Sequence, residues 1–212
     1  MTAPSPASPA AIAPPDAVLR FWFGTTRPGN TEALAQKTLW FAKSDALDEQ
    51  IRQQFGSAVQ AAIAGDLQDW ERDPWSALAL IVLLDQFTRN IYRGNAEAFA
   101  GDARALALSL RLQADGADQQ LPAVARVFVY LPMEHSEDWA MQARSVQAFT
   151  ALVESEAGEP DVQAYLRGSL DYAQRHQVVI AQFGRFPHRN AALGRANTPQ
   201  EAQYLAQPGA GF

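Results

Sequence analysis

Start and stop signals for helices recur along this chain, and no segment shows the alternating pattern of a β-strand. Helix starts are marked by three pairs in which an acidic or capping residue precedes a proline suited to the first helical position: Asp73-Pro74, Glu159-Pro160 and Thr198-Pro199. Three glycines stand where helices would end: Gly65, Gly116 and Gly158. Because sustained period-2 runs of β-branched residues are absent, the sequence predicts an all-α protein.

The spacing of these signals predicts about nine helices. We expect them near residues 16–23, 31–42, 44–64, 74–91, 96–114, 122–130, 133–156, 160–183 and 199–206. The connections are short, which favours antiparallel helical hairpins stacked in chain order. No 34-residue repeat signature is visible, so a regular repeat array is not demonstrated.

The 212 residues fit one compact domain, which we expect to span 16–212. Residues 1–15 are rich in Pro, Ala and Ser and are predicted to be a disordered leader. No Lys or Arg precedes Arg20, so the leader lacks the charged start of a signal peptide, and we expect a cytoplasmic protein.

Composition excludes several classes of function. The net charge of −6 argues against a protein that binds duplex nucleic acid. The longest apolar run, Ala77–Leu84, is far shorter than the roughly 18 residues of a membrane span. The absence of cysteine excludes disulfides and thiolate chemistry. Fifteen of the 17 basic residues are arginine, which reflects either genome composition or a use of arginine for bidentate anion recognition.

The first unusual segment is Leu83–Gly94, which extends the apolar run Ala77–Leu84 that we expect to be the central buried helix. Asp85 and Arg89 lie four residues apart on one helix face, and Arg93 follows one turn later. Unpaired buried charge is costly, so these residues either form a structural ion pair or line a pocket.

The second segment is Tyr130–Trp139. We expect Pro132 to begin a helix with Glu134 and Asp138 in its early turns, where acids stabilise the helix N-terminus. On such a helix, His135 begins a stripe through Trp139 that points inward. An inward histidine is either a satisfied core residue or part of a site.

The third segment is the loop Gln182–Arg195, which holds three arginines and a histidine but no acid. The helix before it places His176 on its buried face, and three loop phenylalanine and leucine side chains need burial: Phe183, Phe186 and Leu193. We therefore expect a docked loop, and its polar residues are candidate contacts for an anion: Arg185, His188, Arg189 and Asn190. Arg89-Asn90 and Arg189-Asn190 share the pattern R-N-x-x-x-G, either by chance or because both helix ends face one cavity.

Four blocks of this chain resemble the hallmark blocks of the bacterial domain of unknown function 924 family: VLRFWFG (18–24), LLDQFTRNIYRG (83–94), YLPMEHSEDWAMQ (130–142) and QFGRFPHRNAALGR (182–195). The resemblance covers nearly the whole chain after the leader. It departs at Thr88, where we would expect proline. The resemblance implies a right-handed tetratricopeptide-like helical stack and implies no particular reaction.

The leading hypothesis is a buried polar pocket for a small anionic molecule, either a carboxylate or a phosphate. Its proposed acid/base residues are His135 and His176 with Asp85 to orient them. The candidate ligand contacts are Arg89, Asn90, Arg93, Glu134, Asp138, Arg185, His188, Arg189 and Asn190. We expect the three segments to converge, so that His135, Arg89 and the 184–190 loop lie together.

Two alternatives stay open. A tetratricopeptide-like module could hold an acidic peptide in a groove without catalysis. A metal enzyme could use His135, Asp138 and Glu134 with His176 or His188. Because the chain has neither H-E-x-x-H nor a duplicated E-x-x-H, the sequence predicts no metal site and no cofactor. Binding of single-stranded RNA fits the acidic composition least, and the sequence does not indicate an oligomeric state.

Overall fold

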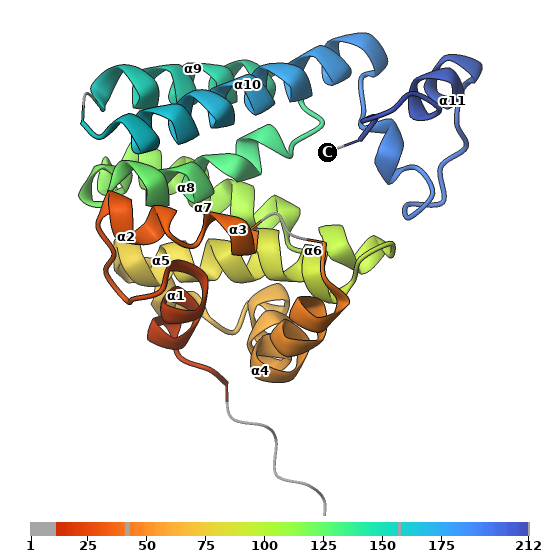
Figure 1. The fold of residues 1–212 in the computed structure, drawn as a ribbon. Helices are drawn as coiled ribbons and strands as arrows, with labels where there is room; N and C mark the ends of the chain where they lie inside the picture. The colour runs from red at the N-terminus through yellow and green to blue at the C-terminus, as the bar shows by residue number, and fades with distance from the viewer. Residues whose placement is uncertain (1–11, 41–42, 157, 212) are drawn as a thin grey trace, which may run out of the picture.

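The computed structural model describes residues 12–40, 43–156 and 158–211. These residues form α-helices joined by short 3-10 segments, and none of them lies in a strand. The all-α prediction is therefore confirmed for this part of the chain (Figure 1). Most of the predicted leader, residues 1–11, lies outside the described residues.

The helices follow one another in the order that the capping signals indicate. Their bounds are α1 (Pro15–Phe23), α2 (Asn30–Leu34), α3 (Lys37–Trp40), α4 (Asp45–Ala64), α5 (Pro74–Ile81), α6 (Thr88–Ile91), α7 (Asp102–Ala114), α8 (Ala123–Glu134), α9 (Trp139–Ser155), α10 (Pro160–Phe183) and α11 (Pro199–Leu205). A π-helical segment, η2 (Val82–Phe87), joins α5 to α6. The 3-10 segments are η1 (Gln68–Arg72), η3 (Ala96–Phe99), η4 (Ala117–Gln120) and η5 (Pro187–Arg189).

The centre of the molecule is the continuous run α5–η2–α6. Every residue of the predicted central segment Ala77–Leu84 is 0% exposed, so its burial on all sides is confirmed. Trp22 of α1 packs edge-on against this run and against α8: its ring centroid lies 5.4 Å from that of Phe87 in η2 and 5.9 Å from that of Phe128 in α8. The block 18–24 is therefore a packing element of the core.

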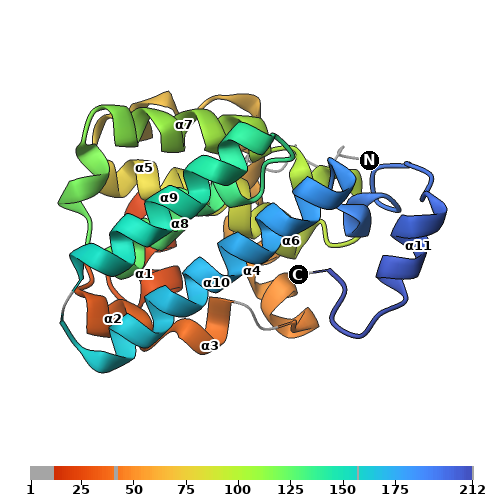
Figure 2. The ribbon, with the colours of Figure 1, turned by 90° about the horizontal axis from the view of Figure 1, so that it is seen from above.

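The remaining helices cover this centre in layers. Helices α9 and α10 lie side by side as a hairpin on one side of the molecule, while α1 and α4 lie on the opposite side (Figure 1). Helix α8 packs beneath the α9–α10 pair. The C-terminal segment with α11 extends beyond the end of α10, on the side where α6 ends (Figure 2). That end of the layers is where the polar segments meet.

Capping explains several of the observed boundaries. The Asp73 and Thr198 side chains accept backbone N–H bonds at the starts of α5 and α11, as predicted. Gly65 ends α4 with a φ of 93°, a left-handed conformation that favours glycine. Gly158 does not have a positive φ, and α9 ends earlier, at Ser155.

Three predicted helices are corrected. The segment 31–42 contains two short helices, α2 and α3, because the backbone turns after Leu34. The segment 96–114 is η3 followed by α7. Pro132 does not begin a helix but lies inside α8, where the apolar face of Ala123–Met133 is buried and outweighs one lost N–H bond.

The helix predicted over 133–156 therefore begins later, at Trp139. The residues between Glu134 and Trp139 form a tight turn instead of a helical stripe. Trp139 is 55% exposed, so the prediction that its side chain points inward is wrong. Within the described residues, no helix combines the length and apolar character needed to cross a membrane.

Candidate functional site

Asp85 lies within the π-helical segment η2. Its side chain is fully buried. The wider π-turn changes the backbone hydrogen-bond pattern, and two side chains one turn later donate to carbonyls of this segment. Thr88 Oγ1 donates to Leu84 O at 2.8 Å, and Arg89 Nη1 donates to Asp85 O at 2.5 Å. These bonds fix Asp85 inside the core and Arg89 at its edge.

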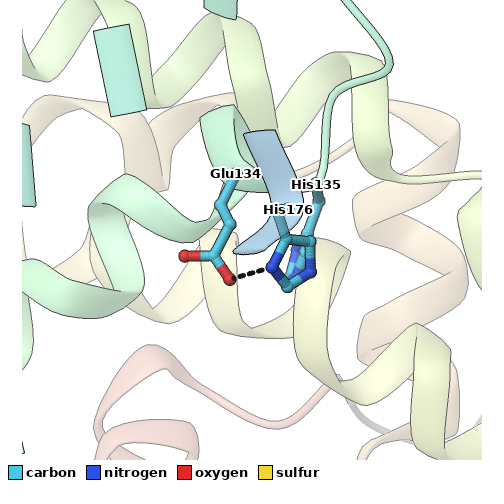
Figure 3. Close-up of side chains that lie close together, drawn as sticks. All are labelled: Glu134, His135 and His176. Carbon is cyan, nitrogen blue, oxygen red and sulfur yellow. Dashed lines mark ion pairs between the residues drawn. The ribbon is translucent and has the colours of Figure 1, made fainter. Parts of the chain in front are cut away.

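Glu134, His135 and His176 lie together at the end of α8 and the middle of α10 (Figure 3). One potential metal-ligating atom from each of the three lies within 4.8 Å of the others. Glu134 Oε1 is 3.1 Å from His176 Nδ1, and the two imidazole ring centroids are 6.1 Å apart. Glu134 is 3% exposed and His176 is 4% exposed, so this group is held in the interior.

Hydrogen bonds determine which nitrogen of each imidazole carries the proton. His135 Nδ1 lies 2.8 Å from Asp85 Oδ1, and His176 Nδ1 lies 2.8 Å from Tyr172 O. An ionised carboxylate and a backbone carbonyl can only accept, so Nδ1 donates in both rings. The lone pair of each neutral ring therefore sits on Nε2.

The pKa values of these groups are shifted by burial and by neighbouring charge. Burial lowers the pKa of His176 to about 2, with His135 as the next cause, and burial also lowers the pKa of His135. Burial opposes ionisation of Asp85, but Arg89 and His135 outweigh it and hold the pKa of Asp85 well below its usual range. Burial, followed by the negative charge of Asp85, raises the pKa of Glu134 well above its usual range.

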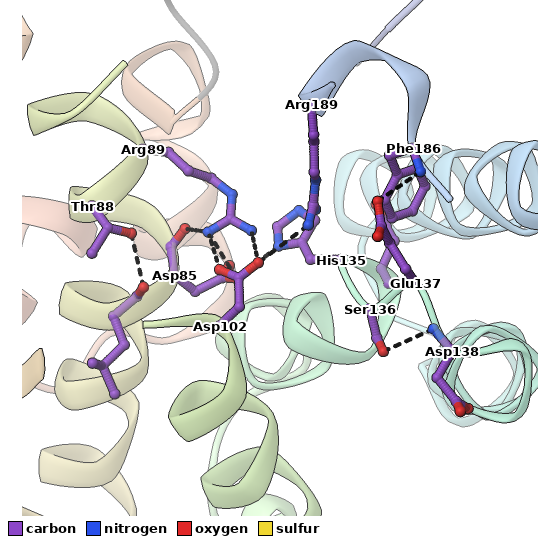
Figure 4. Close-up of polar contacts among 12 residues, drawn as sticks. Asp85, Thr88, Arg89, Asp102, His135, Ser136, Glu137, Asp138, Phe186 and Arg189 are labelled. Carbon is purple, nitrogen blue, oxygen red and sulfur yellow. Dashed lines mark hydrogen bonds and ion pairs between the residues drawn. The ribbon is translucent and has the colours of Figure 1, made fainter. Parts of the chain in front are cut away.

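Arg89 and Arg189 meet at one carboxylate, that of Asp102 at the start of α7 (Figure 4). Arg89 bonds both oxygens of Asp102 at 3.0 and 3.2 Å, and Arg189 Nη1 bonds Oδ2 at 3.2 Å. Arg89 also lies 3.3 Å from Asp85 Oδ1. The guanidinium of Arg189 lies 4.7 Å from the ring centroids of both Phe99 and Phe186, so two aromatic faces hold it.

We call these seven residues the central cluster: Asp85, Arg89, Asp102, Glu134, His135, His176 and Arg189. Its rim reaches solvent, because the side chains of Arg89, Asp102 and His135 keep exposures of 22, 24 and 16%. Burial, followed by the nearby charge of Arg89, lowers the pKa of Arg189 to about 10. The cluster thus combines two cations, carboxylates and two neutral imidazoles, and three of its side chains are partly exposed to solvent.

The turn after α8 holds His135 in place. Gln142 on α9 is fully buried and its Nε2 donates to Glu134 O and Ser136 O, both at 2.6 Å. Glu137 accepts from Phe186 N at 2.8 Å and forms a bidentate pair with Arg195 at 2.7 and 2.9 Å. The turn and the C-terminal loop are therefore tied together beside the cluster.

Comparison with known proteins places the chain in a family without assigning it a reaction. Residues 18–209 match the family described as "Bacterial protein of unknown function (DUF924)". The chain belongs to the DUF924 family. It is also similar to the solved "Structure of Protein of Unknown Function ATU0120 from Agrobacterium tumefaciens", with 34% identity and a TM-score of 0.76, over 92% of this chain and 97% of that chain. No curated protein matches the sequence.

The expected convergence of the three segments is confirmed in this DUF924 protein. His135 bonds Asp85, which pairs with Arg89, and Arg189 of the 184–190 loop reaches the Asp102 carboxylate that Arg89 also binds. The inward orientation of His135 and His176 is likewise confirmed, although His135 lies in a turn and not on a helical stripe. His188 lies near the cluster, 5.5 Å from the Phe186 ring, and burial lowers its pKa to about 4.

Other predicted site residues lie outside the cluster. Asn90 and Arg93 both bind Asp48 on α4, at 2.7 and 2.8 Å. Asp138 caps α9 by accepting from Met141 N.

In the C-terminal loop, the two remaining candidates have partners of their own. Arg185 pairs with the buried Glu201 at 2.6 Å. Asn190 bonds Asn197 at 2.7 Å and accepts from Arg195 Nε. Phe186 is fully buried as expected, whereas Leu193 remains 37% exposed.

Sequence reasoning missed Asp102, Phe99 and Gln142. Asp102 looks like an ordinary acid in the first turn of a helix, and its sequence distance from both arginines hides its role. The small residue before it, Gly101, is the one local signal of a close approach.

Proposed function

We propose that the central cluster binds a small molecule that carries a carboxylate or a phosphate. The observation that supports this most directly is that Arg89 and Arg189 both contact the single carboxylate of Asp102. Within the described part of the chain, Arg189 Nε is buried without a hydrogen-bond partner. A bound anion would satisfy this donor and would reduce the repulsion between the two guanidinium groups.

The proposal includes proton handling on that molecule. His135 and His176 are neutral imidazoles with their lone pairs on Nε2, and Asp85 and Tyr172 O orient them. His135 is the candidate proton acceptor, because Asp85 stabilises the imidazolium that would form. His176, with its pKa lowered to about 2 by burial, stays neutral and can only orient or ligate. Two further ionisable side chains, His188 and Glu134, lie near these two histidines. Five other predicted contacts do not belong to this site, because they bond to residues outside the cluster: Arg185, Asn190, Asn90, Arg93 and Asp138.

Thermal unfolding in the presence of anions tests the proposal. Phosphate, sulfate or a dicarboxylate should raise the Tm by mass action, measured after removal of metal with EDTA. Arg189→Gln should abolish the gain. Arg185→Gln is the matched control, because it lies in the same loop and pairs with an acid outside the cluster. Equal gains in wild type and in Arg189→Gln would refute the proposal.

A second function, a tetratricopeptide-like module for acidic peptides, has one observation in its favour. Helices α8, α9 and α10 pack in chain order as neighbours, which is the arrangement of stacked helical hairpins. A peptide would then contact an extended surface. Binding of an acidic peptide that survives Arg189→Gln would favour the module over the small-anion site.

A further inference from the structure

We infer that Glu134, His135 and His176 bind a divalent transition-metal ion of the Zn²⁺ or Co²⁺ class. The inference deepens the proposed function, because it assigns a cation to the imidazole side of the same cluster. When the ion is bound, the Nε2 lone pairs of His135 and His176 ligate it, so the ion replaces the imidazoles in the proposed proton handling. It depends on the proposed function in one respect: the small anion described above is the molecule that would bind next to the ion. Binding of the ion itself needs no anion.

The first argument is the donor set and its spacing. Two imidazoles and one carboxylate are a common three-ligand set for zinc, with the fourth position open. Ligand atoms about 2.0–2.2 Å from one ion lie about 3.3–3.6 Å from each other in tetrahedral geometry. The three residues offer ligand atoms within 4.8 Å of one another. Glu134 Oε1 lies 3.1 Å from Nδ1 of His176, so the Glu134 side chain must rotate toward Nε2 to close the site.

The second argument is the outer shell. Metal-binding histidines almost always donate their other N–H to a carboxylate or a backbone carbonyl, which fixes the ring and its tautomer. His135 does so to Asp85 and His176 does so to Tyr172 O, both at 2.8 Å. The two histidines therefore have the two kinds of hydrogen-bond acceptor, a carboxylate and a backbone carbonyl, that orient metal-binding histidines.

The third argument is the charge around Glu134. Its Oε2 is buried and has no hydrogen-bond partner within the described residues. The nearby arginines face other acids: Arg89 pairs with Asp85 and Asp102, and Arg189 pairs with Asp102. A cation bound between Glu134 and the two histidines would supply the missing partner for this carboxyl group.

The position of the ion also fits an anionic substrate. The His135 ring lies 6.1 Å from the ring of His176, which contacts Glu134. His135 also bonds Asp85, which pairs with Arg89 at the rim. An open coordination position there would place a bound water or a substrate oxygen next to the arginines.

Titration of the full-length, tag-free, EDTA-treated protein with Co²⁺ tests the inference. We expect one ion per chain and visible absorption bands typical of nitrogen and oxygen ligands, with Zn²⁺ displacing Co²⁺. Glu134→Gln and His176→Gln should each weaken Co²⁺ binding by more than about 100-fold. Asp85→Asn should weaken it by about 10–100-fold, as loss of an outer-shell partner does.

Glu201→Gln is the matched control, because Glu201 is 2% exposed, as buried as Glu134, and pairs with Arg185 away from the cluster. It should bind Co²⁺ like the wild type. Glu134→Gln keeps the shape of the side chain, and far-UV circular dichroism should show an unchanged helical fold. Absence of Co²⁺ binding in the wild type, or equal binding in the folded Glu134→Gln variant, would overturn the inference.

The same titration separates this inference from the proposed function. Phosphate stabilisation of the EDTA-treated protein without any Co²⁺ binding would leave the anion site standing and remove the metal. Co²⁺ binding that depends on Glu134, without any effect of anions on the Tm, would support the metal site and refute the proposed anion site.

Discussion

Gly101 packs against Leu84 so closely that a Cβ atom on Gly101 would lie 2.2 Å from the Leu84 carbonyl oxygen. This contact joins the start of α7 to the π-helical segment η2. Thr88 Oγ1 donates to the same carbonyl oxygen. Because Asp102 directly follows Gly101, the close approach is what places its carboxylate beside Arg89 and Arg189.

Gly101→Ala is therefore expected to destabilise the protein. The new methyl group meets backbone atoms, which cannot rotate away, so overpacking should lower the free energy of unfolding by about 1–3 kcal/mol or more. Urea denaturation measures the change. The control is Gly168→Ala in α10, where nothing lies within 4 Å of the added Cβ and helix propensity should add about 1 kcal/mol. If both variants behave alike, the close approach is not a constraint.

Asp85→Asn should be the most destabilising single change in the central cluster. Asp85 is fully buried, and its carboxylate pairs with Arg89 and accepts hydrogen bonds from His135 and Gln86. Removing the charge leaves Arg89 undercompensated, for which a loss of about 3–5 kcal/mol is typical. A double-mutant cycle with Arg89→Gln checks the cause, because the coupling energy should exceed about 1 kcal/mol. Additive losses would mean that the pair does not act as a unit.

Gln142→Leu should loosen the turn that carries His135. The amide of Gln142 bonds the carbonyls of Glu134 and Ser136, and both would be left without this donor. We expect a loss of about 2 kcal/mol, since each buried group that loses its partner costs about 1–3 kcal/mol. Amide hydrogen exchange should speed up at 134–138 more than in α4. Uniform acceleration throughout the chain would argue against a local role.

The helices were largely predictable because their signals are local. The bounds of α10 match the expected 160–183, and Asp73 and Thr198 cap where their sequence context indicates. Pro132 misled the prediction because a proline marks a helix start only when burial does not favour continuing the helix. In α8, the apolar side chains on both sides of Pro132 are buried, so the helix continues to Glu134.

The candidate site was predictable only in part. His135, His176 and Arg89 stand out because charged or titratable residues on apolar helix faces need partners. Their partners do not stand out. Asp102 becomes relevant only when distant segments pack together. Tyr172 O is a backbone carbonyl one turn before His176 on the same helix, and the residue type at position 172 does not signal it. The same limit applies to Arg185, whose loop contains no acid but whose partner Glu201 lies in the next helix.

The Arg185–Glu201 pair should make the C-terminal segment sensitive to acid. Hydrogen bonds from Arg185, then from Thr198 N, lower the pKa of Glu201 from its ordinary value of 4.5 to about 2. Because the folded pKa lies below the unfolded one, the stabilisation is present above about pH 4.5 and is lost as the pH falls toward 2. The NMR amide signals of α11 should therefore weaken over this range. Glu201→Gln should weaken these signals already at neutral pH and flatten their pH dependence, while an unchanged dependence in that variant would show that another carboxylate holds α11.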